Sequence, residues 1–274
     1  MTAREAHAKS RPRDADILLP KQVFRRGAAR ARDVESQPGQ AELHERLCRF
    51  APFADLPGRM LDSIAAATRA CIFHAGEMLW HQGDRAERTL FIETGLAKTA
   101  RRNSVGTLRT YGLHGPGDSM GVYAIFAGDD YPTDAIALSE GMSGLIVEGS
   151  CLSQLASRHT VLANRLLVEV GRFTETFFHK IEIVSAGTIE RRLAVLMSWL
   201  MQRYGKHAKT TSSGVMVYLP ISLTLAHVAE IVDARIETVA RVFSLWKRRG
   251  WLTMDTRGCE FQDIAAIRML AAGA

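Results

Sequence analysis

The chain has 274 residues, of which 47% are hydrophobic and 23% are charged. This length suffices for two domains, and the composition supports a buried core, which excludes a wholly disordered chain and a small disulfide-stapled protein. No apolar run approaches the roughly 20 residues of a membrane-spanning helix, and the N-terminus lacks the apolar segment of a secretory signal. We therefore expect a cytoplasmic protein with no membrane partner.

The net charge of +6 is unevenly distributed along the chain. Residues 1–40 hold nine Lys or Arg against five Asp or Glu, and residues 41–185 hold fourteen against seventeen. Residues 186–274 hold twelve against seven. The basic C-terminal part favours a polyanionic partner, most simply nucleic acid.

The first elements can be predicted in chain order. Residues 1–40 are basic with few apolar groups, which predicts a flexible arm because such a segment buries too little surface to offset its ordering entropy. Apolar residues at helical spacing predict two short helices, at 42–53 and 60–70. Residues 72–148 hold short apolar stretches between glycine turns, a pattern typical of strands in a sandwich or barrel. We assign residues 41–160 to this barrel domain.

A long helix is predicted from about residue 162 to 184, within a segment assigned to residues 161–186. Its apolar residues recur every three or four positions, as in the seam of a coiled coil. The alternative is an ordinary helix packed on its own domain, but its aromatic character favours a homodimer seam. Gly187 is a plausible hinge, and Thr188 can cap the next helix. The predicted seam residues are Leu166, Val170, Phe173, Phe177 and Val184.

The most specific local pattern lies within the last segment, assigned to residues 187–274. Thr224 can cap a first helix, residues 233–235 can form a turn, and a second helix is predicted over 236–249. Two helices joined by a short turn are typical of a helix-turn-helix that reads DNA. A predicted hairpin at 251–261 would supply the wing of a winged helix.

Four residues at the start of the second helix are predicted to read bases: Ile236, Glu237, Ala240 and Arg241. Arg can bond O6 and N7 of guanine, and Glu can accept from N4 of cytosine. The alternative is a surface pair between Glu237 and Arg241, worth only a few tenths of a kcal/mol. The basic cluster nearby favours DNA. The predicted phosphate contacts are Thr224, Thr238, Lys247, Arg248 and Arg257.

This order of barrel, long helix and winged helix-turn-helix resembles the cyclic-AMP receptor protein/FNR (Crp/Fnr) family of bacterial transcription regulators, over roughly residues 42–270. The resemblance implies an α+β fold: an N-terminal cyclic-nucleotide-binding-type β-roll (a jelly-roll barrel), a long dimerisation helix and a C-terminal winged helix-turn-helix. It also implies a homodimer on double-stranded DNA, with RNA polymerase as a partner if the protein is an activator. The residues that carry it are Gly76-Glu77, Gln82-Gly83-Asp84, Phe91 to Gly95, Pro116-Gly117-Asp118, Gly121 and Glu237 to Arg241.

The resemblance also implies a DNA site. In the family, the residues matching Glu237 and Arg241 read the G·C pair of a TGA core. Ile236 stands where the cyclic-AMP receptor branch has an arginine, and an apolar side chain can pack on a thymine methyl instead. We therefore expect an inverted repeat of a TTGA-type half-site.

The effector site departs from the family members that bind cyclic AMP. Those members place Gly-Glu-Leu in the phosphate cassette and Arg-Ser about ten residues on. Here the cassette reads Gly121-Val122-Tyr123, and Pro132 and Thr133 lie where Arg-Ser would be. Thr176 matches a family position that meets the adenine. Because burying a phosphate without a counter-charge is costly, we expect this candidate effector pocket not to take cyclic AMP.

Other sensor chemistries stay open. The arm lacks the cysteine group of the iron–sulfur branch, and the four cysteines form no CxxC, so no metal site is predicted. Haem is possible, with Cys71 or His81 as an axial ligand. Oxidation could act at Cys48, Cys71, Cys151 or Cys259, and a regulator without a switch is the last option. The cofactor is unknown.

Two further function classes can be weighed against a DNA-binding regulator. A signalling module without transcriptional output would share the barrel, but it would not need Glu237, Arg241 or the wing. An enzyme is disfavoured, because the sequence has no glycine-rich phosphate loop with lysine, no HExxH and no GxSxG. We expect a transcription regulator without catalytic residues.

Overall fold

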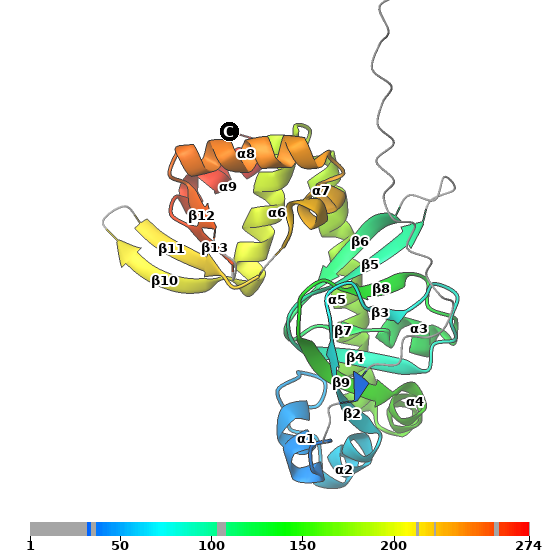
Figure 1. Ribbon diagram of the computed structural model, residues 1–274. Coiled ribbons are helices and arrows are strands. Elements are labelled where there is room, and N and C mark those ends of the chain that lie inside the picture. The colour runs from blue at the N-terminus through cyan, green and yellow to red at the C-terminus, as the bar shows by residue number, and fades with distance from the viewer. Residues whose placement is uncertain are drawn as a thin grey trace, which may run out of the picture.

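A computed structural model of the chain describes residues 32–33, 37–102, 108–211, 214–221, 223–254 and 258–273. Figure 1 shows a barrel and a smaller helical unit with its own sheet, joined by one long helix, α5 (Thr160–Ser185). None of the described helices is long and apolar enough to cross a membrane.

The barrel is built from two antiparallel sheets. One has the strand order β1-β2-β9-β4-β7, and the other has the order β3-β8-β5-β6. This β-roll, with the long helix and the C-terminal unit, confirms the predicted α+β fold class. The strands are β1 Arg32–Asp33, β2 Thr68–Phe73, β3 Met78–Trp80, β4 Arg88–Thr94, β5 Ala97–Arg102, β6 Leu108–His114, β7 Ser119–Met120, β8 Asp134–Ala137 and β9 Met142–Glu148.

The central strands β4 and β9 are buried on both faces, which explains their nearly continuous apolar runs. Helices cover one face, and the second sheet covers the other. Gly144 in β9 allows a close approach to β4, because a Cβ at this position would lie 2.4 Å from the carbonyl oxygen of Phe91. The helices of the barrel are α1 Gln40–Leu47, α2 Gly58–Ala66, α3 Val122–Ala127 and α4 Gly149–Arg158.

The second predicted helix, at 60–70, is partly wrong. It ends at Ala66, because residues 68–73 form strand β2 and pair with β9. Helical spacing of apolar residues cannot detect this change, since the strand pairing involves residues about seventy positions away.

The predicted flexible arm also differs at its C-terminal end. Strand β1 adds to the edge of β2, with Arg32 opposite Ile72. The side-chain amide of Gln37 bonds both backbone groups of Ala70, at 3.0 and 3.1 Å. The edge of a sheet offers backbone N–H and C=O groups that an added strand can pair with. The composition of the arm alone does not predict this pairing. Residues 1–31 and 34–36 lie outside the described residues.

The long helix forms as predicted, and most residues of the predicted seam contact the barrel of their own chain. Leu166 is fully buried in the barrel's core, and Val170 packs against the same cluster. The Phe173 ring stacks on His114 at 5.8 Å, Phe177 meets the Tyr111 ring at 6.2 Å, and Val184 is only half-buried. The helix carries two apolar stripes, and the predicted one faces its own barrel. The exposed stripe consists of Val161, Leu167, Val168, Phe178 and Ile181.

The C-terminal unit begins after Gly187, whose φ of +86° breaks the helix. Thr188 caps α6, since its hydroxyl accepts from the backbone N–H of Arg191 at 3.3 Å. Three more helices and a sheet with the strand order β10-β11-β13-β12 complete the unit. Its elements are α6 Ile189–Tyr204, β10 Lys206–Thr211, β11 Gly214–Leu219, α7 Leu225–Val232, α8 Ile236–Arg248, β12 Leu252–Met254, β13 Cys259–Phe261 and α9 Ile264–Ala272.

The core of the C-terminal unit continues into the barrel. Leu96 and Leu113 of the barrel belong to the same buried cluster as Leu193 and Leu200 of α6. Ile183, near the end of α5, lies in this cluster as well. The two parts therefore share packed side chains in addition to the chain that connects them.

Candidate nucleic-acid interface and sensor pocket

Helices α7 and α8 form the helix-turn-helix. The Thr224 hydroxyl caps α7, accepting a backbone N–H at 3.1 Å. Asp233 ends α7 in the left-handed conformation, with φ +56°, which Asp tolerates better than most residues. The inner face of α8 is fully apolar, with Val239, Phe243 and Trp246 buried. These features fix the turn and leave the opposite face of α8 to solvent.

The residues predicted to read bases lie on that open face. Ile236, Glu237 and Arg241 are exposed, and Ala240 is half-buried. Glu237 and Arg241 lie one turn apart on the same side of the helix. No ion pair joins them in the described part of the chain, which speaks against the surface-pair alternative. Both side chains are available to a partner.

Of the predicted phosphate contacts, four lie on described residues. Thr224, Lys247 and Arg248 are exposed, and Thr238 is half-buried. Arg257 lies outside the described residues. The predicted wing hairpin consists of β12 and β13, which pair in antiparallel fashion beside the C-terminal end of α8 (Figure 1).

The neighbouring basic residue, Arg249, has a structural role. Its guanidinium lies 4.9 Å from the Trp251 ring centroid and 3.5 Å from Oε1 of Glu190. The indole N–H of Trp246 donates to the same Glu190 oxygen at 3.1 Å. These contacts anchor the C-terminal end of α8 to α6.

Strands β5 and β6 of the barrel hold the end of α7. The Lys98 ammonium and the Thr110 hydroxyl both donate to the carboxylate of Glu230, at 2.5 and 2.6 Å. Arg109 pairs with Asp233 at 2.7 Å. Lys98 is only 6% exposed, so Glu230 is the counter-charge of a buried cation. The helix-turn-helix is thereby fixed against the barrel.

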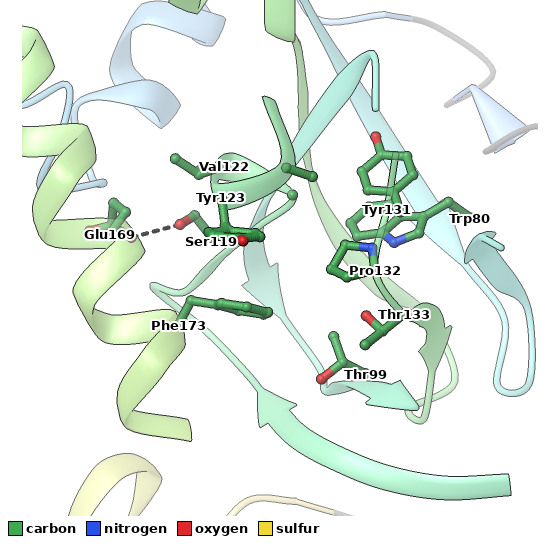
Figure 2. A pocket seen from close by; sticks show the side chains of 12 residues that line it. Trp80, Thr99, Ser119, Val122, Tyr123, Tyr131, Pro132, Thr133, Glu169 and Phe173 are labelled. Atoms are coloured by element: carbon green, nitrogen blue, oxygen red, sulfur yellow. Dashed lines mark hydrogen bonds between the residues drawn. The ribbon is translucent and has the colours of Figure 1, made fainter. Parts of the chain in front are cut away.

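A pocket lies between the β-roll and α5 (Figure 2). Five of the six predicted effector residues line it: Gly121, Val122, Tyr123, Pro132 and Thr133. Thr176 does not line it. The Thr176 hydroxyl instead donates to the carbonyl of Phe173 at 2.7 Å, within α5. The prediction missed Trp80, Thr99, Ser119, Ala124, Tyr131, Glu169 and Phe173, which complete the lining.

The lining of the pocket is aromatic and carries no positive charge. Trp80 and Tyr131 stack with ring centroids 4.3 Å apart, and Tyr123 and Phe173 stack at 6.1 Å. No lysine or arginine is among the lining residues. A phosphate placed there would lose its hydration without gaining a counter-charge.

The one charged group in the lining is Glu169 of α5, which is 3% exposed. Its carboxylate accepts from the Ser119 hydroxyl at 2.8 Å (Figure 2) and from Arg172 at 2.9 Å. Burial raises the pKa of Glu169, while these two partners oppose that rise. Glu169, Phe173 and Thr176 follow one another at steps of four and three residues, so helical periodicity could have placed them on one face.

The residues considered for haem and thiol sensing do not line this pocket. The pocket lining has no histidine, cysteine or methionine, and no cluster suited to a metal ion occurs in the described ranges. Burial raises the pKa of Cys71 to about 12, so its reactive thiolate is scarce. Cys259 is also buried, Cys151 is partly buried, and Cys48 is exposed.

Comparisons with known proteins agree with this architecture. Residues 71–159 match the cyclic nucleotide-binding domain family. The chain is 22% identical over 221 residues to the CRP-like cAMP-activated global transcriptional regulator of Mycobacterium tuberculosis, covering 81% of this chain and 96% of that protein. It is also 22% identical over 236 residues to the transcriptional activator protein anr of Pseudomonas aeruginosa, covering 85% and 94%.

Solved structures show the same fold. FixK2 from Bradyrhizobium japonicum superposes with a TM-score of 0.64 at 20% identity, covering 76% of this chain and 98% of FixK2. A transcriptional regulator of the CRP family from Thermus thermophilus gives 0.58 at 21% identity, covering 74% and 97%. The fold is a cyclic-nucleotide-binding-type barrel joined by a long helix to a C-terminal unit with a helix-turn-helix, as in these structures. The chain is similar to transcription regulators of the Crp/Fnr family over most of its length, and residues 71–159 match the cyclic nucleotide-binding domain family.

Proposed function

We propose that the protein is a homodimeric, sequence-specific DNA-binding transcription regulator. In this proposal residues 41–160 form the sensor, residues 161–186 the dimerisation helix and hinge, and residues 187–274 the DNA-binding domain. The observation that carries it is the pair Glu237 and Arg241, exposed and unpaired with each other on the open face of α8. A signalling module without transcriptional output would have no use for this face.

The half-site follows from the chemistry of that face. Arg241 would bond guanine, and Glu237 would accept from cytosine. Ile236 is 47% exposed and offers only apolar surface, which suits the methyl group of thymine. These three side chains support a TTGA-type half-site in an inverted repeat, with centres about one helical turn apart.

The homodimer is supported by the exposed stripe of α5. Leu167, Phe178 and Ile181 are 57–67% exposed, and they lie on the face that turns away from the barrel. Several large apolar side chains exposed on one helix face mark an interaction surface. We infer that a second copy of the chain covers it, which would give the two-fold symmetry that an inverted repeat requires.

We also infer that the sensor pocket does not take cyclic AMP. The lining supports this inference, because it pairs aromatic rings with a buried carboxylate and offers phosphate no cation. RNA polymerase is a partner if the protein acts as an activator.

Selection from a random duplex library with the full-length protein tests the function. We expect an enriched inverted repeat with TTGA half-sites. Recovery of TGTGA or of an unrelated motif would overturn the half-site. DNA affinity that depends on salt but not on sequence would instead favour the signalling module.

A further inference from the structure

A basic hairpin interrupts an otherwise acidic barrel. The stretch from residue 94 to residue 117 contains no Asp or Glu, although the barrel as a whole has more acidic than basic residues. The stretch does contain four Lys or Arg, and all four lie in β5 and β6. They are Lys98, Arg101, Arg102 and Arg109.

The strand register concentrates this charge. Arg101 and Arg109 lie directly opposite each other on β5 and β6, so their side chains share one face of the ladder. Like charges in that relation destabilise a strand pair. Arg109 is half exposed and has Asp233 as a counter-charge, whereas Arg101 is exposed and forms no ion pair with any described residue. An anionic group of another molecule would reduce the repulsion between Arg101 and Arg109.

The hairpin lies beside the DNA-reading helix. Asp233, the partner of Arg109, comes three residues before Ile236, where α8 begins. Lys98 and Thr110 bind Glu230 of α7, which fixes the same strands against the helix-turn-helix. Figure 1 shows β5 and β6 rising beside α7, next to the end at which α8 starts. Charge on the hairpin is therefore held close to the base-reading residues.

We propose that the exposed arginines of this hairpin, Arg101 above all, bind the DNA backbone outside the base pairs that α8 reads. The partner is the phosphate backbone, because guanidinium groups pair with phosphate and such contacts add affinity without sequence preference. The proposal rests on the proposed DNA-binding function and extends it. The sensor barrel then contributes directly to the footprint on DNA.

The test compares full-length wild type with R101A and the charge reversal R101E. The matched controls are R59A and R59E, because Arg59 is exposed on α2 at the opposite end of the barrel (Figure 1). Fluorescence anisotropy follows binding to two duplexes, one limited to the TTGA inverted repeat and one extended by about ten base pairs, one helical turn, on each side. Thermal unfolding midpoints verify that each variant is folded.

Wild type should bind the extended duplex more tightly than the short one. In R101A the slope of log affinity against log salt should fall by about two on the extended duplex, one for each subunit of the dimer, which is a roughly sixteenfold smaller loss of affinity between about 50 and 200 mM salt. R101E should lower the slope further, and preference for the repeat over a scrambled duplex should not change. The Arg59 variants should match wild type.

Equal slopes for R101A, R101E and wild type on the extended duplex would overturn the proposal. If those variants bound DNA normally but lost transcription from a template with RNA polymerase, the hairpin's partner would be a protein surface and the DNA proposal would be wrong. The proposed function is tested separately with wild type alone. If wild type shows no preference for the repeat over the scrambled duplex, the proposed function is wrong.

Discussion

The proposed DNA binding depends on two side chains of one helix face, Glu237 and Arg241. Each is exposed, and the two do not form an ion pair with each other, so both can contact a partner. Lys247 is exposed on the same helix, ten residues beyond Glu237, where a base contact is not expected. Base reading and backbone binding are thus assigned to different parts of α8, and this separation can be measured.

Replacing Arg241 with Ala should cost about 1–3 kcal/mol of binding free energy and relax specificity at one base pair, because a bidentate contact to guanine is lost. Lys247→Ala should instead weaken binding to all sequences and reduce the salt slope by about two, one for each subunit of the dimer. Anisotropy titrations on single-base variants of the site measure both effects. A uniform loss in R241A would contradict its base-reading role.

His114 gives the barrel a pH dependence. It is fully buried on β6, and burial lowers its pKa to about 4, against about 6.5 in an unfolded chain. Between these values the unfolded state binds more protons, so the free energy of unfolding should fall as pH drops from about 6.5 to about 4. Denaturant unfolding at several pH values should show a weaker dependence in His114→Gln. The exposed His159→Gln is the control and should behave as wild type.

At the scale of elements, the helix-turn-helix could be predicted from sequence because its signals are local. The cap, the turn and the spacing of Glu237 and Arg241 all lie between residues 224 and 241. The pocket could be predicted only in part, since Trp80, Ser119 and Glu169 come from three distant elements. The spacing of apolar residues located α5, but it did not show which side of the helix contacts the barrel. A helix with two apolar stripes gives the same pattern whichever stripe faces the barrel.

The exposed stripe of α5 makes a prediction about assembly. Phe178→Glu places a charge on a side chain that is 62% exposed in one chain and would be buried between two. We expect the dimer to dissociate, because an unpaired charge at an apolar interface is costly. Light scattering coupled to size exclusion measures the mass. Met269→Glu, at a side chain 60% exposed on α9, is the control and should remain a dimer. An F178E protein that stays dimeric would contradict the proposal that a second copy covers the exposed stripe of α5.

For the whole molecule, the contact between barrel and helix-turn-helix sets the position of α7 and α8 relative to the barrel. Glu230 and Asp233 form ion pairs with the barrel, and the shared apolar core adds packed side chains to the contact. The chain bends at Gly187, which is exposed between α5 and α6. An effector that changed the pose of α8 would have to act against these contacts, so their strength sets how readily the molecule switches.

Glu230→Ala should loosen this contact, because it leaves the buried Lys98 ammonium without its carboxylate. A charged hydrogen bond of this kind contributes about 1.5–3 kcal/mol, so cleavage near Gly187 in limited proteolysis should rise by roughly tenfold or more. Glu175→Ala, at an exposed position of α5, should leave the cleavage rate unchanged. Equal rates in both variants would show that the shared core alone holds the two parts.

The shared core also restricts how this protein can be recombined with its relatives. A chimera joined at Gly187 would transplant α6 and α7 away from Leu96 and Leu113, the barrel residues that pack into their cluster. It would also separate Lys98 from Glu230. The barrel and the C-terminal unit therefore cannot be exchanged independently. A graft that keeps these contacts must carry strands β5 and β6 together with the helix-turn-helix that they contact.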